Sequence, residues 1–408
     1  MNKRVLYISY DGMTDPLGQS QVIPYLSGLT AKGHQIWLLS AEKKDAFTRH
    51  RQKINTLLQN HNINWFPIPY TKKPPILSTV IDIIRLQRKA KMLVKKNNIE
   101  LVHCRSYITA FVGLHLKKKG IPFVFDMRGF WADERVDGNI WNLNNPLYRL
   151  VYRFFKRREK QFLASADAIV SLTENAKTEM LQWNIHGLTP EKISVIPCCA
   201  DLDFFDYNQI KKSAHEMWRQ QLNILPETFV LSYLGSVGTW YLPHEMLAFF
   251  KELLTQKPES CFLFITKDSP EIIQQLAALQ GIPLEKIRIQ PAEREQVPEL
   301  LSISNASIFF IKPAYSKKAS SPTKLAELMG LGIPIIANSG VGDIERVMQE
   351  NPSGILIHEF NAPAYHKALN ELSRLISHEK HLTRQLACEY FSLERGIATF
   401  DAIYQKLH

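Results

Sequence analysis

The 408-residue sequence lacks a long uninterrupted apolar run. Its first apolar stretch, Val5–Ser9, is followed by Asp11 and Gly12 and is too short for a secretory signal or a membrane-spanning helix. No later stretch reaches the length that a spanning helix needs. We therefore expect a cytoplasmic protein, with attachment at the inner face of the plasma membrane as a further possibility.

The sequence also lacks a cysteine pattern. Five cysteines are scattered without a CxxC pair, which argues against a disulfide framework or a zinc site and favours buried thiols. His103 has no further metal ligands at suitable spacing. Asp201 and Asp203 form a DxD sequence, but Phe204 follows them in a polar linker, so we expect a turn cap. The sequence therefore predicts no metal site and no cofactor.

Acidic residues are fewer than basic ones, 39 Asp and Glu against 50 Lys and Arg, giving a net charge of +11. Such a balance favours polyanionic partners such as an anionic membrane, nucleic acid or phosphorylated substrates, although it also serves solubility. The aromatic residues follow buried patterns and no recognition motif is present, so nucleic acid is the least favoured partner.

Short apolar runs alternate with amphipathic helical patterns along the whole chain. This alternation predicts a doubly wound α/β fold with parallel sheets, and the length favours two domains. The pattern restarts after a polar segment at 201–227. We place one domain at 1–203, completed by a C-terminal helix at 390–408, and the other at 204–389. The expected strands are Val5–Ser9, Ile36–Ser40, Leu101–Cys104, Phe123–Asp126, Ala168–Leu172 and Ser194–Pro197, then Phe229–Leu234, Cys261–Thr266, Ile287–Gln290, Ser307–Ile311 and Ile333–Ala337.

The stretch 320–332 predicts a capped helix with a charged edge. Ser321 is expected as the N-cap, Pro322 as the first helical residue, and Gly332 as the C-terminal glycine. Lys324 falls in the first turn and Glu327 one turn later on the same edge. Free N–H groups and the helix dipole, with Lys324, would form a seat for a diphosphate, and Glu327 could accept hydrogen bonds from sugar hydroxyls. The alternative is an ordinary capped surface helix.

The longer run 321–337 resembles the donor-site signature of the family-four retaining glycosyltransferases with the GT-B fold. Four other stretches resemble the same family in the expected order: 18–26 after the first strand, 126–134, 195–205, and the glycine-containing loop 235–238. The resemblance implies two Rossmann-like lobes facing across a cleft, the first for the acceptor and the second for a nucleotide-sugar donor. It also implies that Glu327 binds the donor ribose and the helix start holds the diphosphate.

The sequence departs from that family at four positions. Ala319 stands where the family has the first glutamate of an acidic pair, and Ser236 and Tyr241 stand where it has an arginine and a lysine. Arg128 replaces a common histidine. We expect Lys324, Lys312 and Arg128 to supply the missing positive charge.

The candidate site residues form three sets. We predict catalytic roles for Arg128, Lys324 and Glu327. The expected donor-binding residues are Gly235, Ser236, Lys312, Ser320, Ser321, Thr323, Lys324 and Glu327. The expected acceptor or phosphate-binding residues are Gly18, Gln19, Arg105, Asp126 and Arg128, where Asp126 could orient Arg128 or simply form a structural ion pair with it.

Two basic amphipathic helices are expected in the first domain, at 80–96 and 147–162. A basic helix with an aromatic apolar face can lie on an anionic membrane. The alternative is that the apolar face of 147–162 packs on the sheet and leaves a solvated basic face.

The sequence thus predicts a retaining glycosyltransferase, a hexosyltransferase of cell-surface polysaccharide synthesis, that moves a sugar from a nucleoside diphosphate to a glycan or lipid-linked glycan. Two alternatives remain open: a non-catalytic nucleotide-sugar-binding subunit, and an epimerase of the same fold.

Overall fold

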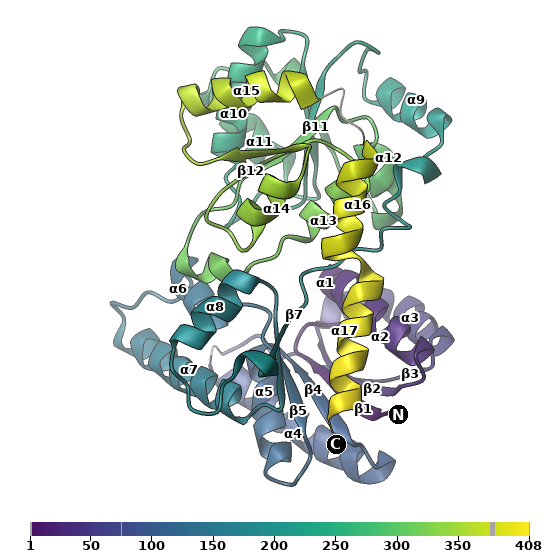
Figure 1. Ribbon diagram of the computed structural model, residues 1–408, viewed down its shortest axis with the longest axis vertical. Helices are drawn as coiled ribbons and strands as arrows, with labels where there is room; N and C mark the ends of the chain where they lie inside the picture. Colours follow the sequence, from purple (N-terminus) through teal and green to yellow (C-terminus); the bar gives the residue numbers. More distant parts are fainter. Residues whose placement is uncertain (1, 75, 376–379, 408) are drawn as a thin grey trace. The chain divides into compact units, whose positions relative to one another are not determined.

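The computed structural model describes residues 2–74, 76–375 and 380–407. The chain forms two compact units, Met1–Cys199 with Leu393–His408, and Ala200–Ser392 (Figure 1). Each unit is a doubly wound α/β domain around a parallel sheet, as the alternating pattern predicts. In the described parts of the chain, no helix is both long enough and apolar enough to cross a membrane.

The first unit contains a seven-stranded parallel sheet in the order β3-β2-β1-β4-β5-β6-β7. Its strands are β1 Arg4–Ser9, β2 Gln35–Glu42, β3 Ile63–Pro69, β4 Leu101–Arg105, β5 Phe123–Asp126, β6 Ala168–Ser171 and β7 Ile193–Val195. The edge strand β3 was not predicted, because its two prolines interrupt a strand pattern that only an edge position tolerates. His103 and Asp126 therefore belong to the fourth and fifth strands, one later than the sequence suggests.

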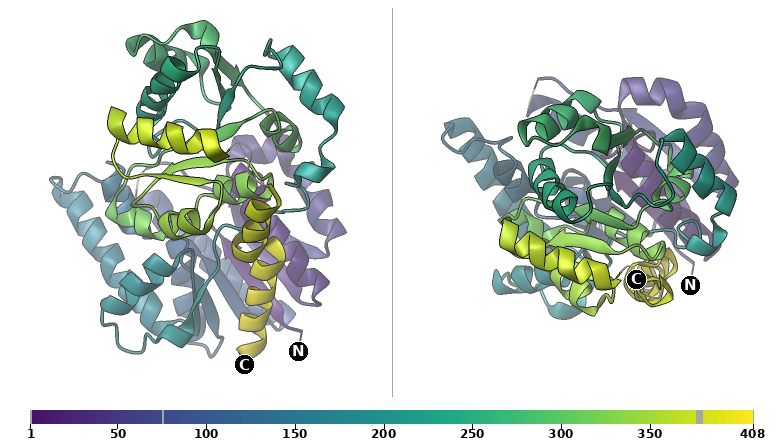
Figure 2. Two further views of the ribbon diagram at one scale, coloured as in Figure 1. Left: turned by 45° about the horizontal axis from the view of Figure 1, so that its top comes forward. Right: turned by 90° about the horizontal axis from the view of Figure 1, so that it is seen from above.

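Helices cover the first sheet. They are α1 Pro16–Gln21, α2 Ile23–Ala31, α3 Lys44–Asn60, α4 Leu77–Asn97, α5 Ser106–Lys117, α6 Trp131–Asp137, α7 Pro146–Ser165, α8 Glu174–Gln182 and α17 Leu393–Lys406. The C-terminal helix α17 returns to this unit and packs along α2 (Figure 1 and Figure 2). The predicted helix at 390–408 is in fact divided at Ser392, because the helix before it belongs to the second unit.

Helix α7 does not bury its whole apolar face. Phe155 and Phe162 are buried, but Leu147, Leu150 and Phe154 are 53%, 67% and 43% exposed. The prediction that this face packs on the sheet therefore holds only for the C-terminal part of the helix. The periodicity shows which side chains share a face, but it does not show how much of that face its neighbours cover.

The second unit contains a six-stranded parallel sheet in the order β10-β9-β8-β11-β12-β13. Its strands are β8 Val230–Leu234, β9 Cys261–Ile265, β10 Ile287–Gln290, β11 Ala306–Phe309, β12 Ile335–Asn338 and β13 Gly354–Ile357. The four-residue edge strand β13 was missed, because a run that begins with glycine and pairs on one side carries a weak pattern.

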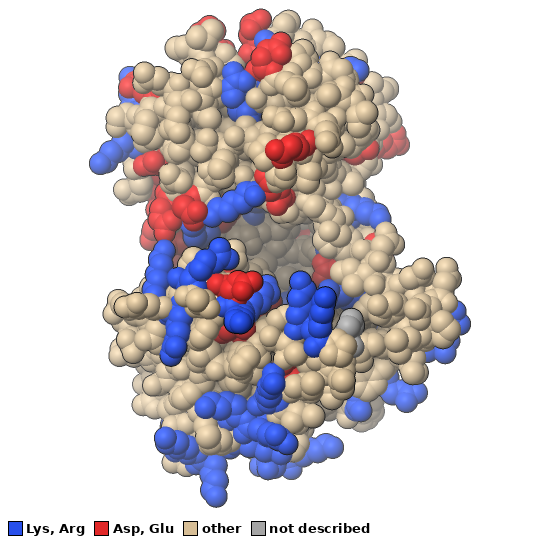
Figure 3. All heavy atoms as spheres, turned by 180° about the vertical axis from the view of Figure 1, so that it is seen from behind, with Lys and Arg blue, Asp and Glu red and all other residues tan. Residues whose placement is uncertain are grey.

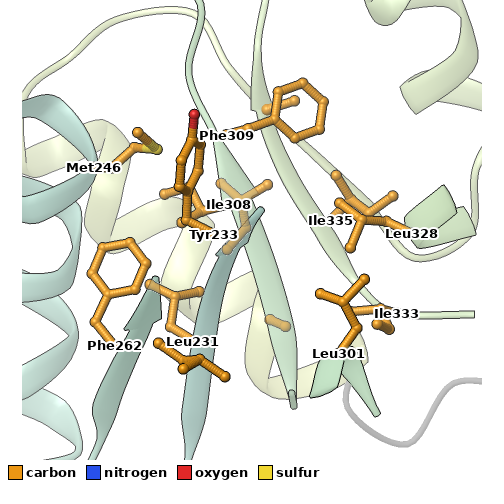
Figure 4. Close-up of a cluster of buried hydrophobic side chains, with 14 of the residues drawn as sticks. Leu231, Tyr233, Met246, Phe262, Leu301, Ile308, Phe309, Leu328, Ile333 and Ile335 are labelled. Carbon is orange, nitrogen blue, oxygen red and sulfur yellow. The ribbon is translucent and has the colours of Figure 1, made fainter. Parts of the chain in front are cut away.

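The helices of the second unit surround this sheet. They are α9 Lys212–Gln221, α10 Pro243–Gln256, α11 Pro270–Leu279, α12 Val297–Leu301, α13 Thr323–Gly330, α14 Ile344–Glu350, α15 Ala362–Leu375 and α16 Lys380–Phe391, with the short 3-10 turns η4 Arg294–Gln296 and η5 Tyr315–Ala319. The core between sheet and helices is apolar (Figure 4), and Leu328 of α13 packs into it. This packing fixes α13 beside the carboxyl ends of the strands.

Candidate functional site

Helix α13 begins one residue later than the cap pattern predicts. Pro322 occupies the N-cap position with extended backbone angles (φ −74°, ψ 120°), and its side chain makes no capping hydrogen bond. Ser321 therefore lies outside the helix, and its predicted role as N-cap is wrong. The C-terminal prediction is confirmed, since Gly332 has a φ of +61° and its N–H donates to the Met329 carbonyl at 3.0 Å.

Lys324, in the first turn of α13, is buried against aromatic rings. Its Nζ lies 4.2 Å from the Tyr233 ring centre and 3.8 Å from the Tyr241 ring centre, and it donates to the Tyr233 hydroxyl at 3.2 Å. Figure 4 shows that this hydroxyl points away from the apolar core. Burial holds the pKa of Lys324 well below its usual range, opposed in part by the charge of Glu327. Within the described residues no carboxylate lies within ion-pair distance of this amine.

Glu327 lies one turn further along α13 and is also buried, with 10% of its side chain exposed. Arg294 Nη1 donates to its Oε1 at 3.3 Å. Burial raises the pKa of Glu327, while the charges of Arg294 and Lys324 work in the opposite direction. The sequence reading missed Arg294, because a partner 33 residues away leaves no periodic signal.

The loop after β8 approaches Lys324 directly. Gly235 adopts a φ of +114°, and a Cβ placed on it would lie 3.0 Å from the Lys324 Nζ. Any side chain here would therefore compete with the amine for space. Ser236, which occupies the place of the family's arginine, donates through its hydroxyl to Asp268 at 2.8 Å, and the Val237 N–H donates to the same carboxylate. Asp268, which anchors the loop, was not predicted.

The remaining predicted donor residues divide into two groups. Ser320, Ser321 and Thr323 are half-buried at the start of α13, next to Lys324. Lys312 is exposed, and its backbone N–H donates to the Trp240 carbonyl at 2.8 Å. The structure therefore brings Gly235, Lys324 and Glu327 together around α13, while the Lys312 side chain faces solvent.

In the first unit, Asp126 lies at the centre of a buried charged cluster. Its Oδ2 is 3.6 Å from both His103 Nε2 and Arg105 Nη1, and its Oδ1 is 3.8 Å from Arg128 Nη1. Burial alone would favour the neutral carboxyl. The charge of Arg128, together with His103 and Arg105, nevertheless holds the pKa of Asp126 below its usual range. His103 is fully buried, and its Nδ1 is 2.7 Å from the Tyr404 hydroxyl of α17.

Arg128 combines an unusual backbone conformation with burial. Its φ of +59° is rare for a residue with a side chain, and only 10% of its side chain is exposed. The guanidinium also contacts the Cys198 sulfur at 3.3 Å. Asp133, seven residues after Asp126, lies outside this cluster and accepts from Tyr152 and Lys156 of α7.

The segment that carries the predicted acceptor or phosphate-binding residues Gly18 and Gln19 is helical. Gly18 lies inside α1, where a Cβ would stand 2.2 Å from the Gly12 carbonyl oxygen, so the glycine is required for close packing. Gln19 donates through its side chain to the Thr14 carbonyl at 3.3 Å. The true loop, Tyr10–Asp15, is held by buried Glu42, which accepts from the Met13 and Thr14 N–H groups. Glu42 was not predicted.

The minor predictions have mixed outcomes. Asp201 accepts from the Phe204 N–H at 3.0 Å, so it caps a turn as expected. All five cysteines are free thiols, but Cys388 is exposed, because its helix position faces solvent. In the described ranges, no group of three His, Cys, Asp or Glu side chains is arranged to hold a metal.

Two family models match the chain: Glycosyltransferase Family 4 over residues 20–204, and Glycosyl transferases group 1 over residues 215–385. A D-inositol 3-phosphate glycosyltransferase of Rhodococcus jostii is 23% identical over 282 residues, which is 67% of this chain and 58% of that protein. The chain thus matches less than two thirds of the length of this relative.

Solved structures resemble the chain over its whole length. A glycosyltransferase from Rickettsia africae superposes with a TM-score of 0.74 at 16% identity, covering 100% of this chain and 98% of that one. Anabaena HepE in complex with UDP-glucose gives 0.69 at 13% identity, covering 100% of both chains. With the two family matches and the two doubly wound units, these similarities show that the chain belongs to the family-4 type of glycosyltransferases with the GT-B fold.

Proposed function

We propose that the chain is a retaining glycosyltransferase. It transfers a hexose from a nucleoside diphosphate donor to a glycan or lipid-linked glycan acceptor in cell-surface polysaccharide synthesis. The observation that carries this proposal is the buried Lys324 amine, which lies without a carboxylate partner among the described residues, at the start of α13 and beside Gly235.

The start of α13 suits a diphosphate. Its first N–H groups have no partners within the helix, and Lys324 adds a positive charge once an anion binds next to it. Burial separates this amine from water, and a bound diphosphate supplies the negative charge that compensates for that loss. Glu327 then accepts hydrogen bonds from the ribose hydroxyls, the role that the family signature implies.

The transfer itself needs little further chemistry from the protein. The bond between the anomeric carbon and the diphosphate oxygen breaks, and the acceptor oxygen bonds to that carbon on the same face. The acceptor proton passes to the departing phosphate oxygen. Lys324 and the helix start stabilise the charge that develops on the diphosphate. The reaction uses neither a metal nor a cofactor, so a chelator should leave turnover unchanged.

The first unit supplies the acceptor side in this proposal. Asp126, Arg105 and Arg128 lie where β4 and β5 end, the edge at which parallel sheets carry their sites. Asp126 fixes both guanidinium groups. Arg105 Nε also contacts Asp11, which is 41% exposed and connects the cluster to the surface. A polar acceptor would meet the cluster there.

A thermal-shift panel of nucleoside diphosphate sugars tests the donor assignment. A ligand at about 100 times its dissociation constant stabilises the folded state by about 2.7 kcal/mol, which is readily detected. The donor that binds is then incubated with candidate acceptors, and proton NMR of the product reads the anomeric configuration. No stabilisation by any panel member would overturn the proposal.

Two other functions give different outcomes in the same assays. A non-catalytic nucleotide-sugar-binding subunit would show donor binding without turnover, and the replacements at Ala319, Ser236 and Tyr241 are the observation in its favour. An epimerase of this fold would convert the donor sugar without any acceptor present.

We further propose that the first unit attaches to an anionic membrane at the inner face of the plasma membrane, in the cytoplasm. On α7 the exposed Leu147, Leu150 and Phe154 alternate with exposed basic residues, and α4 exposes Val80 and Ile84 beside others. The exposed basic residues are Arg149, Arg153, Arg157 and Lys160 on α7, and Arg85, Arg88, Lys91, Lys95 and Lys96 on α4. Figure 3 shows Lys and Arg side chains gathered on one face of this unit.

Vesicle sedimentation tests this attachment. Replacing Arg149, Arg153 and Arg157 by glutamine should reduce binding to phosphatidylserine vesicles about 10-fold or more, because each basic residue near such a surface contributes about 1 kcal/mol. The matched control replaces three exposed lysines of the second unit, Lys211, Lys251 and Lys367. Equal loss in both variants, or equal binding to neutral phosphatidylcholine vesicles, would contradict a specific surface.

A further inference from the structure

Arg294 stands between the donor helix and the linker that enters the second unit. Its Nη1 contacts Glu327 Oε1 at 3.3 Å, and its guanidinium carbon lies 5.7 Å and 5.4 Å from the ring centres of Phe204 and Phe205. The arginine side chain is 40% exposed and the glutamate side chain 10% exposed. The ion pair is therefore mostly screened from water on the Glu327 side.

The backbone around Arg294 is fixed on both sides. A reciprocal capping arrangement between Glu293 and Gln296 closes the η4 turn that carries Arg294. Phe205 is fully buried, and its carbonyl accepts from Arg384 of α16 at 2.9 Å. The same guanidinium nitrogen donates to the Gly330 carbonyl at the end of α13. Arg294 is thus held in place relative to α13 with little freedom to turn away.

We propose that Arg294 is a positioning residue for donor binding: it orients Glu327 through Oε1, so that the carboxylate accepts from the vicinal hydroxyls of a ribonucleoside diphosphate. This inference rests on the proposed function for the identity of the ligand. It assigns to Arg294 the selection of ribose over deoxyribose. A carboxylate accepts a stronger hydrogen bond from the 2′-hydroxyl than a neutral carboxylic acid does, and deoxyribose lacks that hydroxyl.

The charged surroundings of Glu327 support this assignment. Lys324 on the same helix is the other cation that favours its charged form, but burial works against the ammonium itself. On α16, Arg384 is committed to backbone carbonyls and to Asp206 at 3.2 Å, and the Lys380 backbone and Cβ lie against Gly332. Because Arg294 is the cation in contact with Glu327, its loss should raise the pKa of that carboxyl.

The test compares the wild type with Arg294→Met and Arg294→Lys in two measurements. Carboxyl ¹³C NMR of the free protein, assigned with Glu327→Gln, should show the Glu327 pKa higher by about one unit in Arg294→Met and partly restored in Arg294→Lys. In calorimetry, UDP should bind Arg294→Met about 10-fold more weakly near neutral pH, and the preference for UDP over 2′-deoxy-UDP should fall. As the pH decreases, Arg294→Met should lose its affinity for UDP at a higher pH than the wild type does.

Two controls separate positioning from other roles. Lys267→Met removes an exposed cation that pairs with Glu293 at 2.7 Å on the same turn, and it should change neither measurement. In a Glu327→Gln background, Arg294→Met should have no additional effect on UDP binding. An unchanged Glu327 pKa in Arg294→Met would overturn the inference even if no nucleotide bound at all. Failure of UDP to bind the wild type would instead contradict the proposed donor and would leave the role of Arg294 to be decided by the NMR measurement.

Discussion

Two buried charged groups, one around Asp126 in the first unit and one on α13 in the second, differ in whether the protein itself supplies opposite charges. Around Asp126 in the first unit, two guanidinium groups and an imidazole surround one carboxylate, and the pKa of Asp126 is lowered. Around α13 in the second unit, Lys324 lies against tyrosine rings. Burial lowers the pKa of Lys324 and raises that of Glu327, which favours the neutral form of each.

In the first unit the protein itself supplies opposite charges around the buried carboxylate of Asp126. In the second unit it places no carboxylate of the described residues within ion-pair distance of Lys324. Removing one member of such a buried cluster costs much, because the remaining charges are left without their partner. An uncompensated lysine costs stability in the free protein, and that cost is recovered when an anion binds. The two groups should therefore respond differently to substitution, one in stability and the other in ligand binding.

The largest expected effect is on the stability of the first unit. Asp126→Asn leaves Arg105 and Arg128 buried without their shared carboxylate and should lower the free energy of unfolding by about 3 kcal/mol or more. Urea unfolding of the free protein measures this. Asp203→Asn, at an exposed linker position, is the matched control and should stay within about 0.5 kcal/mol of the wild type. A small loss in Asp126→Asn would mean that the cluster is not a compensated one.

The next effect concerns ligand binding in the second unit. Lys324→Met retains the apolar stem but removes the amine, so affinity for the donor diphosphate should fall by about 10- to 100-fold. The thermal midpoint of the free protein should not decrease, because the substitution removes a buried amine that has no carboxylate partner among the described residues. Lys251→Met, at an exposed lysine of α10 outside the predicted donor site, is the matched control and should change affinity by less than about twofold. If Lys324→Met were less stable than the wild type but bound the donor with normal affinity, Lys324 would serve stability and not ligand binding.

The smallest expected effect is a separation of two acid transitions. Because the folded pKa of Asp126 is lowered, its contribution to stability is present above the unfolded pKa and is lost as the pH falls through the folded one. The pKa of Glu327 is raised, so its protonation on acidification favours the folded state but removes the ribose acceptor. Calorimetry and urea unfolding between about pH 8 and pH 2 should show donor affinity falling at a higher pH than stability. Coincident transitions would show that the two carboxylates do not differ in this way.

Much of the fold could be predicted, because hydrophobic periodicity is a local property. It located every central strand and the helices α4, α7, α13 and α17, including the terminal Gly332 of α13. It failed at two of the four sheet edges, β3 and β13, where proline and glycine weaken the pattern. It also misplaced the start of α13, because the extended backbone of Pro322 depends on the loop before it.

The candidate site was only half visible in the sequence. Lys324 and Glu327 follow from their spacing on one helix. Arg294, Asp268 and Glu42, which hold Glu327 and the two loops, come from distant parts of the chain. A long-range side-chain pair leaves no trace in one sequence, since either partner alone is an ordinary polar residue.

The sequence by itself determined the two doubly wound units, the helix that carries Lys324 and Glu327, and the basic character of α4 and α7. Only the tertiary structure decided which charges are compensated, which cation faces Glu327, and that Leu150 and Phe154 remain exposed. The physical reason is that backbone periodicity assigns a side chain to a face, whereas its pKa and its exposure depend on what packs against that face.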